Sequence, residues 1–470
     1  MAGPADTPAM AFDPPPDELE AVLAKVSRLV RDLLDGYAQR PIVGHPTGAH
    51  LVPGLLADRP GEPVSLDEAL ASVHEVVNTG PDIATGGELA YIPPSGLVTS
   101  AIAELIAATA NRYTGLSGQT PAAVALEAGV LSWLTELFDL PATAQAILLS
   151  GGSAANLSAL VAARDKHAPG APHRATIYIG EQAHASVRKA ARIAGIDPAN
   201  VRVLPSPSGL RLDTEAVRLA IKQDLADGLL PIAIVAAAGT TNSGTIDPLP
   251  ALATLARELG VWFHVDAAYG GFFQLTERGR ARLVGIDQAD SITLDPHKSL
   301  FLPFGTGALL VRDRDDLRRA FAEDADYLRD LPDMGELPDF SQLTPELTRD
   351  WRGLKLWLPL KLHGVDAFRA ALDDKLDLAA LAWRMLDEDV NVEVLSRPDL
   401  SIVTFRVRGD DAAQDRALEA VHRDGRVRLS STVIGGRVTL RMAILSHRTD
   451  RDRVELAVRL LSDAAAAESS

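Results

Sequence analysis

Short apolar runs alternate with helical patterns through the middle of the chain, and this alternation restricts the possible fold more than any other feature. Seven runs have the length and apolar content of buried strands: Ala146–Leu149, Ala175–Ile179, Val201–Leu204, Ile232–Ala236, Val261–Val265, Ser291–Leu294 and Ala308–Val311. Helical spacing of apolar residues fills intervals between them, at Ala154–Lys166, Ser186–Ile193, Thr214–Leu225 and Leu249–Glu258. Strands alternating with helices predict an α/β fold, with a mostly parallel seven-stranded sheet covered by helices on both faces.

The two ends of the chain have a different character. Residues 1–16 are rich in Ala and Pro, and apolar residues then recur at helical spacing from Asp17 onward. This spacing predicts an N-terminal helical segment with one apolar face, which we expect to pack on a partner subunit. After about Lys361, a long helical stretch, short strands and further helices predict a small C-terminal α+β domain. The predicted divisions are therefore 1–90, 91–360 and 361–470.

Composition excludes several classes of function. The net charge of −17 argues against nucleic-acid binding and against docking on anionic membranes. The chain has no cysteine, which excludes disulfides, thiolate metal sites and a cysteine nucleophile. We find no signal peptide and no run of about 20 apolar residues that would span a bilayer. These features predict a cytoplasmic protein, and we expect no metal site.

Two charged residues follow neighbouring predicted strands. Asp266 comes directly after Val261–Val265, and Lys298 follows Ser291–Leu294. The carboxyl ends of parallel strands meet at one edge of a sheet, so these side chains are expected to lie close together. A lysine can hold an aldehyde as a Schiff base, and a carboxylate can keep a pyridine nitrogen protonated, as pyridoxal 5'-phosphate (PLP) requires. Taken singly, Asp266 reads equally well as a turn cap, and a lone lysine is usually a surface residue.

Other polar residues are predicted at the same edge. Gly152 and Ser153, in the segment Ser150–Asn156, open a helix whose free N–H groups suit a phosphate; a tight turn with a serine cap is the alternative. His184 can stack on a cofactor ring or can merely cap the next helix. His297 can bind a phosphate or relay a proton. Thr241 lies in a loop rich in hydroxyl groups.

These motifs resemble the pyridoxal-dependent group II decarboxylases, the family of aromatic-L-amino-acid decarboxylase. The resemblance extends from about Ala90 to the C-terminus and includes these segments: Val124–Leu140, Gly151–Arg164, His184–Gly195, Gly239–Asp247, His264–Gly271, Asp295–Leu302, Leu354–Leu358 and Leu440–Ile444. It implies PLP fold type I and a homodimer whose active site lies at the subunit interface.

The resemblance also implies roles for individual residues. Lys298 would be the Schiff-base lysine, and Asp266 would pair with the pyridine nitrogen. His184 would stack on the ring. The remaining residues implied to contact the cofactor are Gly152, Ser153, Thr241, Ala268 and His297.

Residues Phe321–Asp330 resemble the mobile catalytic loop of the family. Tyr327 would return a proton to the α-carbon after carbon dioxide leaves, with His297 as the alternative donor; a surface tyrosine is the plain reading. Arg441 resembles an arginine that meets carboxylates, although a structural ion pair is equally consistent with the sequence. Asp295 departs from the asparagine common in the animal enzymes, and Pro94 replaces a threonine. These departures argue against a catecholamine-type substrate.

The predicted function is PLP-dependent decarboxylation of an L-amino acid to an amine and carbon dioxide. The alternatives on the same fold are an aminotransferase, a carbon–carbon lyase or a decarboxylating aldehyde synthase. A PLP-binding regulator without catalysis is disfavoured, because no basic DNA-binding segment precedes residue 90.

Overall fold

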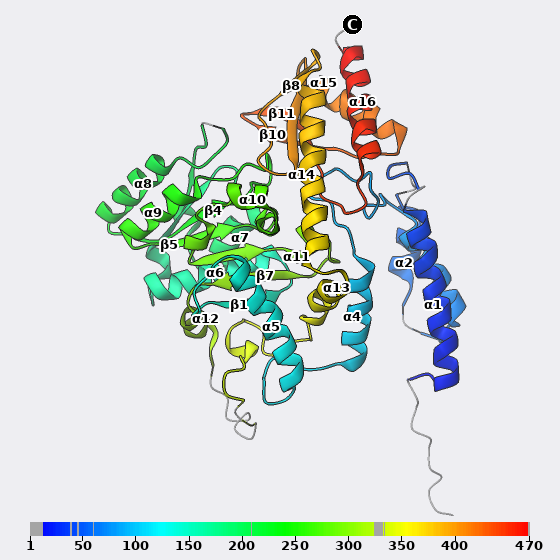
Figure 1. The fold of residues 1–470 in the computed structure, drawn as a ribbon, viewed down its shortest axis with the longest axis horizontal. Helices are drawn as coiled ribbons and strands as arrows, with labels where there is room; N and C mark the ends of the chain where they lie inside the picture. Colours follow the sequence, from blue (N-terminus) through cyan, green and yellow to red (C-terminus); the bar gives the residue numbers. More distant parts are fainter. Residues whose placement is uncertain are drawn as a thin grey trace, which may run out of the picture.

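A seven-stranded sheet forms the centre of the protein in the computed structural model, which describes residues 13–37, 40–44, 47–59, 61–207, 209–323, 332 and 334–468 (Figure 1). The strands lie in the order β1-β7-β6-β5-β4-β2-β3. Their bounds are Gln145–Leu149 (β1), Ala175–Gly180 (β2), Val201–Leu204 (β3), Leu230–Ala237 (β4), Trp262–Asp266 (β5), Ser291–Leu294 (β6) and Gly307–Val311 (β7).

Only β7 runs against its neighbours, so the predicted, mostly parallel sheet is confirmed. Two strands, β3 and β6, match the predicted ranges, and the ends of the others shift by one or two residues. Asp266 belongs to β5 rather than to the following loop, because it stays in register with Ala237 of β4 and Thr293 of β6.

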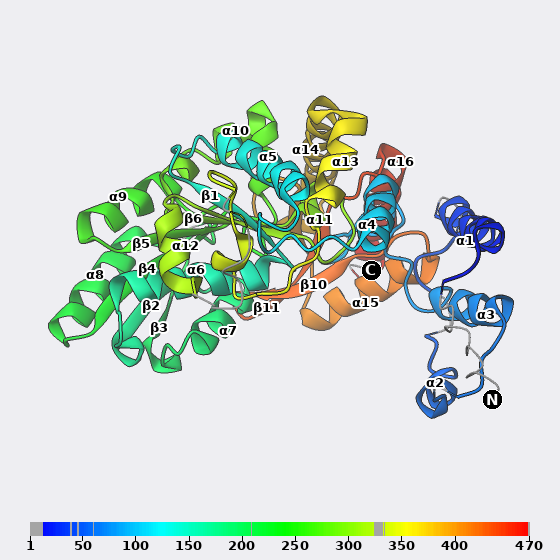
Figure 2. The same ribbon diagram turned by 90° about the horizontal axis from the view of Figure 1, so that it is seen from below.

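Helices cover both faces of this sheet, as predicted. The chain reverses its direction across the sheet after β3. Because crossovers between parallel strands are right-handed, the helices before and after this reversal lie on opposite faces of the sheet. Helix α6 packs across β4 to β7 with α7 and α12 beside it, and α8 and α9 pack against β4 and β5 (Figure 2). Their bounds are Gly152–His167 (α6), Ala185–Ile193 (α7), Thr214–Ala226 (α8), Leu249–Leu259 (α9) and Arg314–Phe321 (α12).

A smaller region with its own apolar core follows the sheet. Its four-stranded antiparallel sheet has the order β10-β11-β9-β8. The elements are Val365–Asp387 (α14), Val392–Val394 (β8), Ile402–Val407 (β9), Asp411–Asp424 (α15), Ser430–Ile434 (β10), Arg437–Ala443 (β11) and Arg451–Glu468 (α16). This confirms the predicted α+β character. Leu89 packs in the same core, and the divisions at residues 90 and 360 stay predictions.

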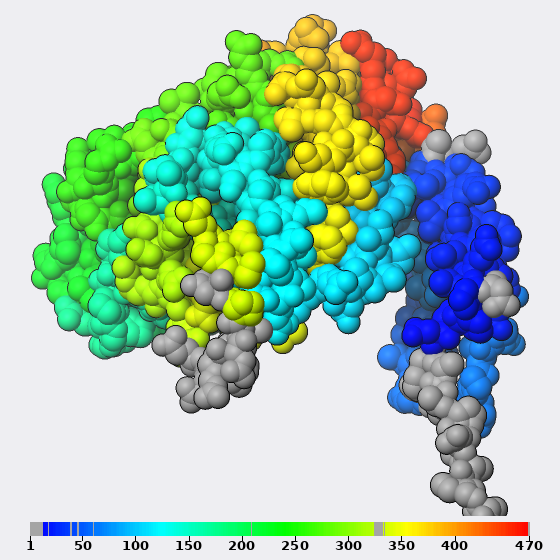
Figure 3. Space-filling view, turned by 60° about the horizontal axis from the view of Figure 1, so that its bottom comes forward, coloured from blue at the N-terminus to red at the C-terminus, as the bar shows by residue number. Residues whose placement is uncertain are grey.

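Three N-terminal helices lie beside the main body: Pro16–Gly36 (α1), Val52–Ala57 (α2) and Leu66–Val77 (α3) (Figures 1 and 3). Ser65 and Glu68 form a capping box at the start of α3. Neither α2 nor α3 buries a residue, and Leu23 and Leu56 are 46% and 67% exposed. These apolar faces are therefore uncovered in a single chain.

The remaining α-helices complete the body: Val98–Ala110 (α4), Pro121–Leu137 (α5), Glu277–Arg282 (α10), Pro296–Ser299 (α11) and Leu354–His363 (α13). Within the described ranges, no helix combines the length and the apolar character needed to cross a membrane. The cytoplasmic location stays a prediction.

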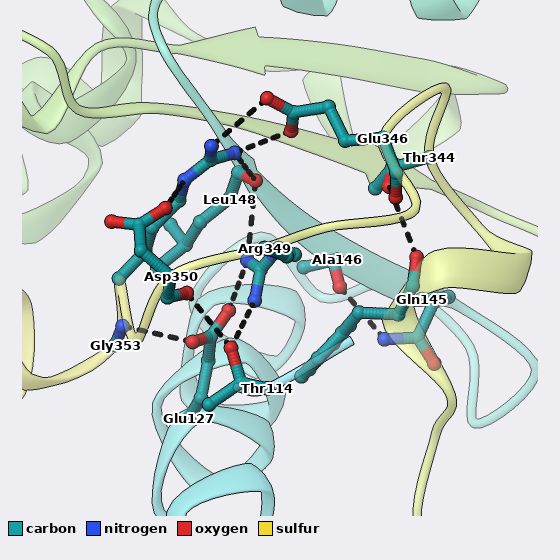
Figure 4. Close-up of polar contacts among 12 residues, drawn as sticks. Thr114, Glu127, Gln145, Ala146, Leu148, Thr344, Glu346, Arg349, Asp350 and Gly353 are labelled. Atoms are coloured by element: carbon teal, nitrogen blue, oxygen red, sulfur yellow. Dashed lines mark hydrogen bonds and ion pairs between the residues drawn. The ribbon is translucent and has the colours of Figure 1, made fainter. Parts of the chain in front are cut away.

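A buried ion pair attaches the segment before α13 to the main body (Figure 4). Arg349 and Glu127 of α5 contact each other with both side chains fully buried. Arg349 also donates to Thr114 Oγ1 at 3.1 Å and to the carbonyl of Leu148 in β1 at 3.2 Å. The second oxygen of Glu127 accepts from the Gly353 N–H at 2.9 Å. Removing one partner would strand a buried charge, so this cluster is expected to be important for stability.

Candidate active site

A cavity of about 480 Å³ opens where the loops after β1, β2, β4, β5 and β6 meet. All of the predicted cofactor-contacting residues line it: Gly152, Ser153, His184, Thr241, Asp266, Ala268, His297 and Lys298. Tyr327, the remaining predicted catalytic residue, lies outside the described residues. The structure thus brings together residues that are up to 146 positions apart in the sequence (298 − 152).

Lys298 lies on the short helix α11, directly after β6. Its Nζ is 2.8 Å from Asp295 Oδ2, and His297 Nε2 is 3.7 Å from the same oxygen. The other oxygen, Asp295 Oδ1, is buried and has no hydrogen-bond partner in the described part of the chain. Asp295 therefore neutralises the lysine ammonium and leaves one oxygen without a partner at the cavity wall.

Asp266 ends β5 at the cavity. Its Oδ2 accepts a hydrogen bond from Asn156 Nδ2 at 2.9 Å, and its Oδ1 accepts one from the Ala268 N–H at 3.2 Å. Among the described residues no cation pairs with it. Hydrogen bonds from neutral donors orient a carboxylate without neutralising it, which leaves it able to pair with a cationic ligand group.

The first turn of α6 forms one wall of the cavity and presents backbone N–H groups there. The first N–H groups of a helix have no carbonyl partner within the helix, and here they belong to Gly152 and Ser153. A side chain at position 152 would place its Cβ 3.0 Å from Asp295 Oδ2 and 3.2 Å from the Ala268 Cβ. Glycine thus permits the close approach of this turn to the cavity wall without displacing its neighbours.

The two predicted histidines are held by specific hydrogen bonds. His184 Nδ1 accepts from the Ser186 N–H at 3.2 Å and lies 2.7 Å from Ser186 Oγ. It therefore caps α7 and also lines the cavity, and its stacking on a cofactor ring stays a prediction. His297 donates from Nδ1 to the carbonyl of Thr306 at 2.6 Å, which leaves its Nε2 facing Asp295.

Thr240 and Thr241, which follow β4, make different contacts. The hydroxyl of Thr240 lies 2.8 Å from Ser243 Oγ and 3.1 Å from Thr245 Oγ1, so it stabilises the loop after β4. Thr241 lines the cavity, and its carbonyl accepts from Arg441 Nη2 at 3.0 Å.

Arg441 is a buried cation whose hydrogen-bond partners are neutral. Besides Thr241, its guanidinium donates to the Asn242 carbonyl at 3.2 Å and to Ser430 Oγ at 3.2 Å. Burial lowers the pKa of Arg441 to about 10. In the described part of the chain Arg441 has no acidic partner, so the structural ion pair that the sequence left open is not observed there.

Sequence reasoning missed Asn156 and Ser186, which line the cavity and hydrogen-bond to Asp266 and His184, and His264, which contacts Asn156. An asparagine on the buried side of α6, which is otherwise rich in Ala, was the available signal for Asn156.

These residues fit PLP. The lysine amine and the aspartate carboxylate share the cavity with free helix N–H groups suited to a phosphate. Asp295 Oδ1 adds a buried polar atom that has no hydrogen-bond partner among the residues that the structure describes.

Comparison with known proteins agrees with this geometry. A family model described as the pyridoxal-dependent decarboxylase conserved domain matches residues 51–408. Aromatic-L-amino-acid decarboxylase of Bacillus atrophaeus is 33% identical over 377 residues, covering 78% of each chain. Phenylacetaldehyde synthase of Arabidopsis thaliana is 30% identical over 470 residues, covering 94% of this chain and 96% of that protein.

A crystal structure of Oryza sativa TDC with PLP and tryptamine superimposes with a TM-score of 0.92 at 28% identity, covering 98% of this chain and all of that one. The shared fold, the family match over most of the chain and the residues of the cavity lead to one conclusion. The chain belongs to the pyridoxal-dependent decarboxylase family and is a PLP-dependent amino-acid decarboxylase.

Proposed function

We propose that the protein converts an L-amino acid into the corresponding amine and carbon dioxide, with Lys298 as the attachment point of the cofactor aldehyde. One observation carries this proposal: Lys298, Asp266 and the Gly152–Ser153 turn line the same cavity. An amine, a carboxylate and phosphate-binding N–H groups are thus available to one ligand.

Asp266 would keep the pyridine nitrogen protonated. Its two oxygens accept from Asn156 and Ala268, both neutral donors, so its charge is available to the ring nitrogen. When bound, PLP supplies a protonated ring that accepts the electrons released as the substrate carboxylate leaves. His184 would stack on the ring and restrict its position.

Arg441 would contribute to substrate binding. A buried guanidinium with neutral partners attracts a carboxylate, but stabilising the carboxylate in the ground state does not accelerate its loss. We therefore expect Arg441→Gln to raise KM about tenfold and to change kcat much less. Steady-state kinetics on the best substrate would measure both constants.

The direct test incubates the purified protein and PLP with a panel of L-amino acids that includes tryptophan, tyrosine, phenylalanine, glutamate and 2,4-diaminobutyrate. We expect equal amounts of carbon dioxide and amine from at least one of them, and none from Lys298→Ala. A keto acid or an aldehyde as the main product, or unchanged turnover in Lys298→Ala, would overturn the proposal.

A second candidate product is an aldehyde, because a relative that matches 94% of the chain is named phenylacetaldehyde synthase. We favour the amine because the chain carries Tyr327 in the segment that resembles the catalytic loop. Tyr327→Phe is expected to divert product from amine toward aldehyde. Amine formation at the normal rate in this variant would show that Tyr327 is not the proton donor.

We also propose that two copies form a homodimer with shared active sites. The exposed apolar side chains on α1 to α3 support this arrangement, because a soluble chain rarely leaves such faces uncovered. Leu55 and Leu56 are 52% and 67% exposed on α2, and Leu219 on α8 is a matched control at 58%. The double variant Leu55→Glu, Leu56→Glu should reduce the mass measured by light scattering to that of a monomer, whereas Leu219→Glu should not. A dimeric mass in the double variant would rule out this interface.

A further inference from the structure

The side chain of Asn156 lies at the wall of the cavity, between the two predicted contacts to the cofactor ring. It projects from the second turn of α6 and is 1% exposed. Its Nδ2 donates one hydrogen bond to Asp266 Oδ2 at 2.9 Å and one to Ser186 Oγ at 3.0 Å. A single amide group therefore donates to Asp266 directly and to Ser186, the residue that contacts His184.

The orientation of this amide has one solution. The carboxylate of Asp266 can only accept, so the amide nitrogen must face it. On the other side, Asn156 Oδ1 accepts from Thr293 Oγ1 at 2.7 Å and lies 3.0 Å from His264 Nε2. Each of the four polar positions of the amide is thus occupied by a complementary group.

The positions of the hydrogens around His264 also follow from its neighbours. Trp262 Nε1 donates to Ser291 Oγ at 2.7 Å, so the Ser291 hydroxyl is free to donate to His264 Nδ1 at 2.7 Å. His264 then carries its proton on Nε2, which donates to Asn156. Burial lowers the pKa of His264 to about 4, so the ring is neutral near pH 7. No positive charge therefore competes for Asp266 from this side.

Asn156 also reaches His184 through Ser186. Since Ser186 Oγ accepts from Asn156, its own hydrogen points to His184 Nδ1 at 2.7 Å. The Ser186 N–H donates to the same nitrogen. His184 Nδ1 is consequently a pure acceptor, and a neutral His184 ring carries its proton on Nε2.

We propose that Asn156 is a positioning residue that sets both ring contacts at once. It orients the carboxylate of Asp266 for the pyridine nitrogen, and through Ser186 it favours one tautomer of His184. The inference rests on the proposed function, in which Asp266 pairs with that nitrogen. A hydrogen bond from a neutral amide suits this task, because it stabilises the carboxylate without neutralising it.

The test compares the binding of two cofactors to wild type and to Asn156→Asp. One is PLP, and the other is the analogue in which carbon replaces the ring nitrogen. The substitution keeps the size and Oδ1 but replaces the donor with an acceptor beside Asp266. We expect the Kd for PLP to rise about ten- to a hundredfold and the Kd for the analogue to change less than about threefold. Equal losses for both cofactors would reduce Asn156 to a structural residue and overturn the proposal.

Two further variants keep the test decisive if Asn156→Asp folds poorly. Thr293→Val removes one anchor of Asn156 Oδ1 and should give a smaller loss of affinity with the same dependence on the ring nitrogen. Ser186→Ala leaves the contact between Asn156 and Asp266 in place, so any loss should be equal for the two cofactors. In Ser186→Ala the N–H of residue 186 still donates to His184 Nδ1, so NMR of isotope-labelled histidine should show the tautomer protonated on Nε2 still favoured, but by less than in wild type. A loss in Thr293→Val that is independent of the ring nitrogen, or a ratio of His184 tautomers in Ser186→Ala identical to that in wild type, would contradict the proposal.

Failure of the proposed function gives a different result. In that case wild type itself would bind PLP and the analogue equally well, or would not bind PLP at Lys298. Failure of the Asn156 inference leaves wild-type discrimination intact and changes only the pattern among the variants.

Discussion

Buried charges are handled in opposite ways in two regions of the molecule. Before α13, Arg349 and Glu127 are both fully buried and neutralise each other (Figure 4). At the cavity, Asp266 and Arg441 have only neutral hydrogen-bond partners among the described residues. The first region is electrostatically complete in the protein alone. The second region leaves charge available to a ligand, and this separates a site that binds from a cluster that stabilises.

The largest expected effect comes from breaking the complete pair. Glu127→Gln would leave the Arg349 guanidinium buried without a counter-ion, and we expect the free energy of unfolding to fall by about 3 to 5 kcal/mol. Urea unfolding measures this change. Asp350→Asn is the matched control, because Asp350 pairs with Arg352 at 2.8 Å while 64% exposed. Its cost should stay below about 1 kcal/mol. Equal losses of unfolding free energy in the two variants would contradict the claim that the buried pair is a stabilising cluster.

Removing the charge of Asp266 at the cavity should affect the reaction more than the stability of the fold. Asp266→Asn is expected to lower turnover roughly a hundred- to a thousandfold, because the ring nitrogen loses its ionic partner. Asp290 is a suitable control at the opposite edge of the sheet, where its carboxylate accepts from the Phe263 N–H at 2.8 Å. Asp290→Asn should leave the turnover per bound cofactor unchanged. Steady-state rates with saturating PLP compare the two, and comparable losses would remove Asp266 from its proposed role.

A smaller effect is expected on the pH dependence of stability. The pKa of His264 is lowered to about 4 from 6.5 by burial, so the unfolded chain takes up a proton that the folded protein refuses. This residue therefore makes the protein less stable as the pH falls from about 6.5 to about 4. In His264→Gln, the loss of unfolding free energy between pH 7 and pH 4.5 should be smaller by roughly 2 kcal/mol. An unchanged pH dependence in urea titrations would show that His264 is not the group responsible.

Much of the fold followed from periodicity. Short apolar runs separated by helical patterns predicted the sheet, because only strands buried on both faces are apolar along their whole length. The strand ends then placed Asp266, Lys298 and His184 at one edge. The apolar spacing from Asp17 likewise predicted α1, whose apolar side chains Leu19, Leu23 and Val30 are exposed in a single chain.

The rest depended on contacts between segments far apart in the sequence. The hydrogen bonds of Asn156 join α6 to β5 and β6, and no spacing in the chain reveals them. The neutral surroundings of Arg441 come from a loop about 200 residues earlier. Asp295 pairs with Lys298 because a short helix begins at Pro296, and the sequence did not predict that helix.

The central claim is that one amine, Lys298 Nζ, holds the cofactor in the cavity. Borohydride reduction of the protein loaded with PLP, followed by peptide mapping with mass spectrometry, tests it most directly. We predict a single stable adduct on the peptide that contains Lys298, and its absence from Lys298→Ala. An adduct on another lysine, such as Lys166 or Lys355, would contradict the account.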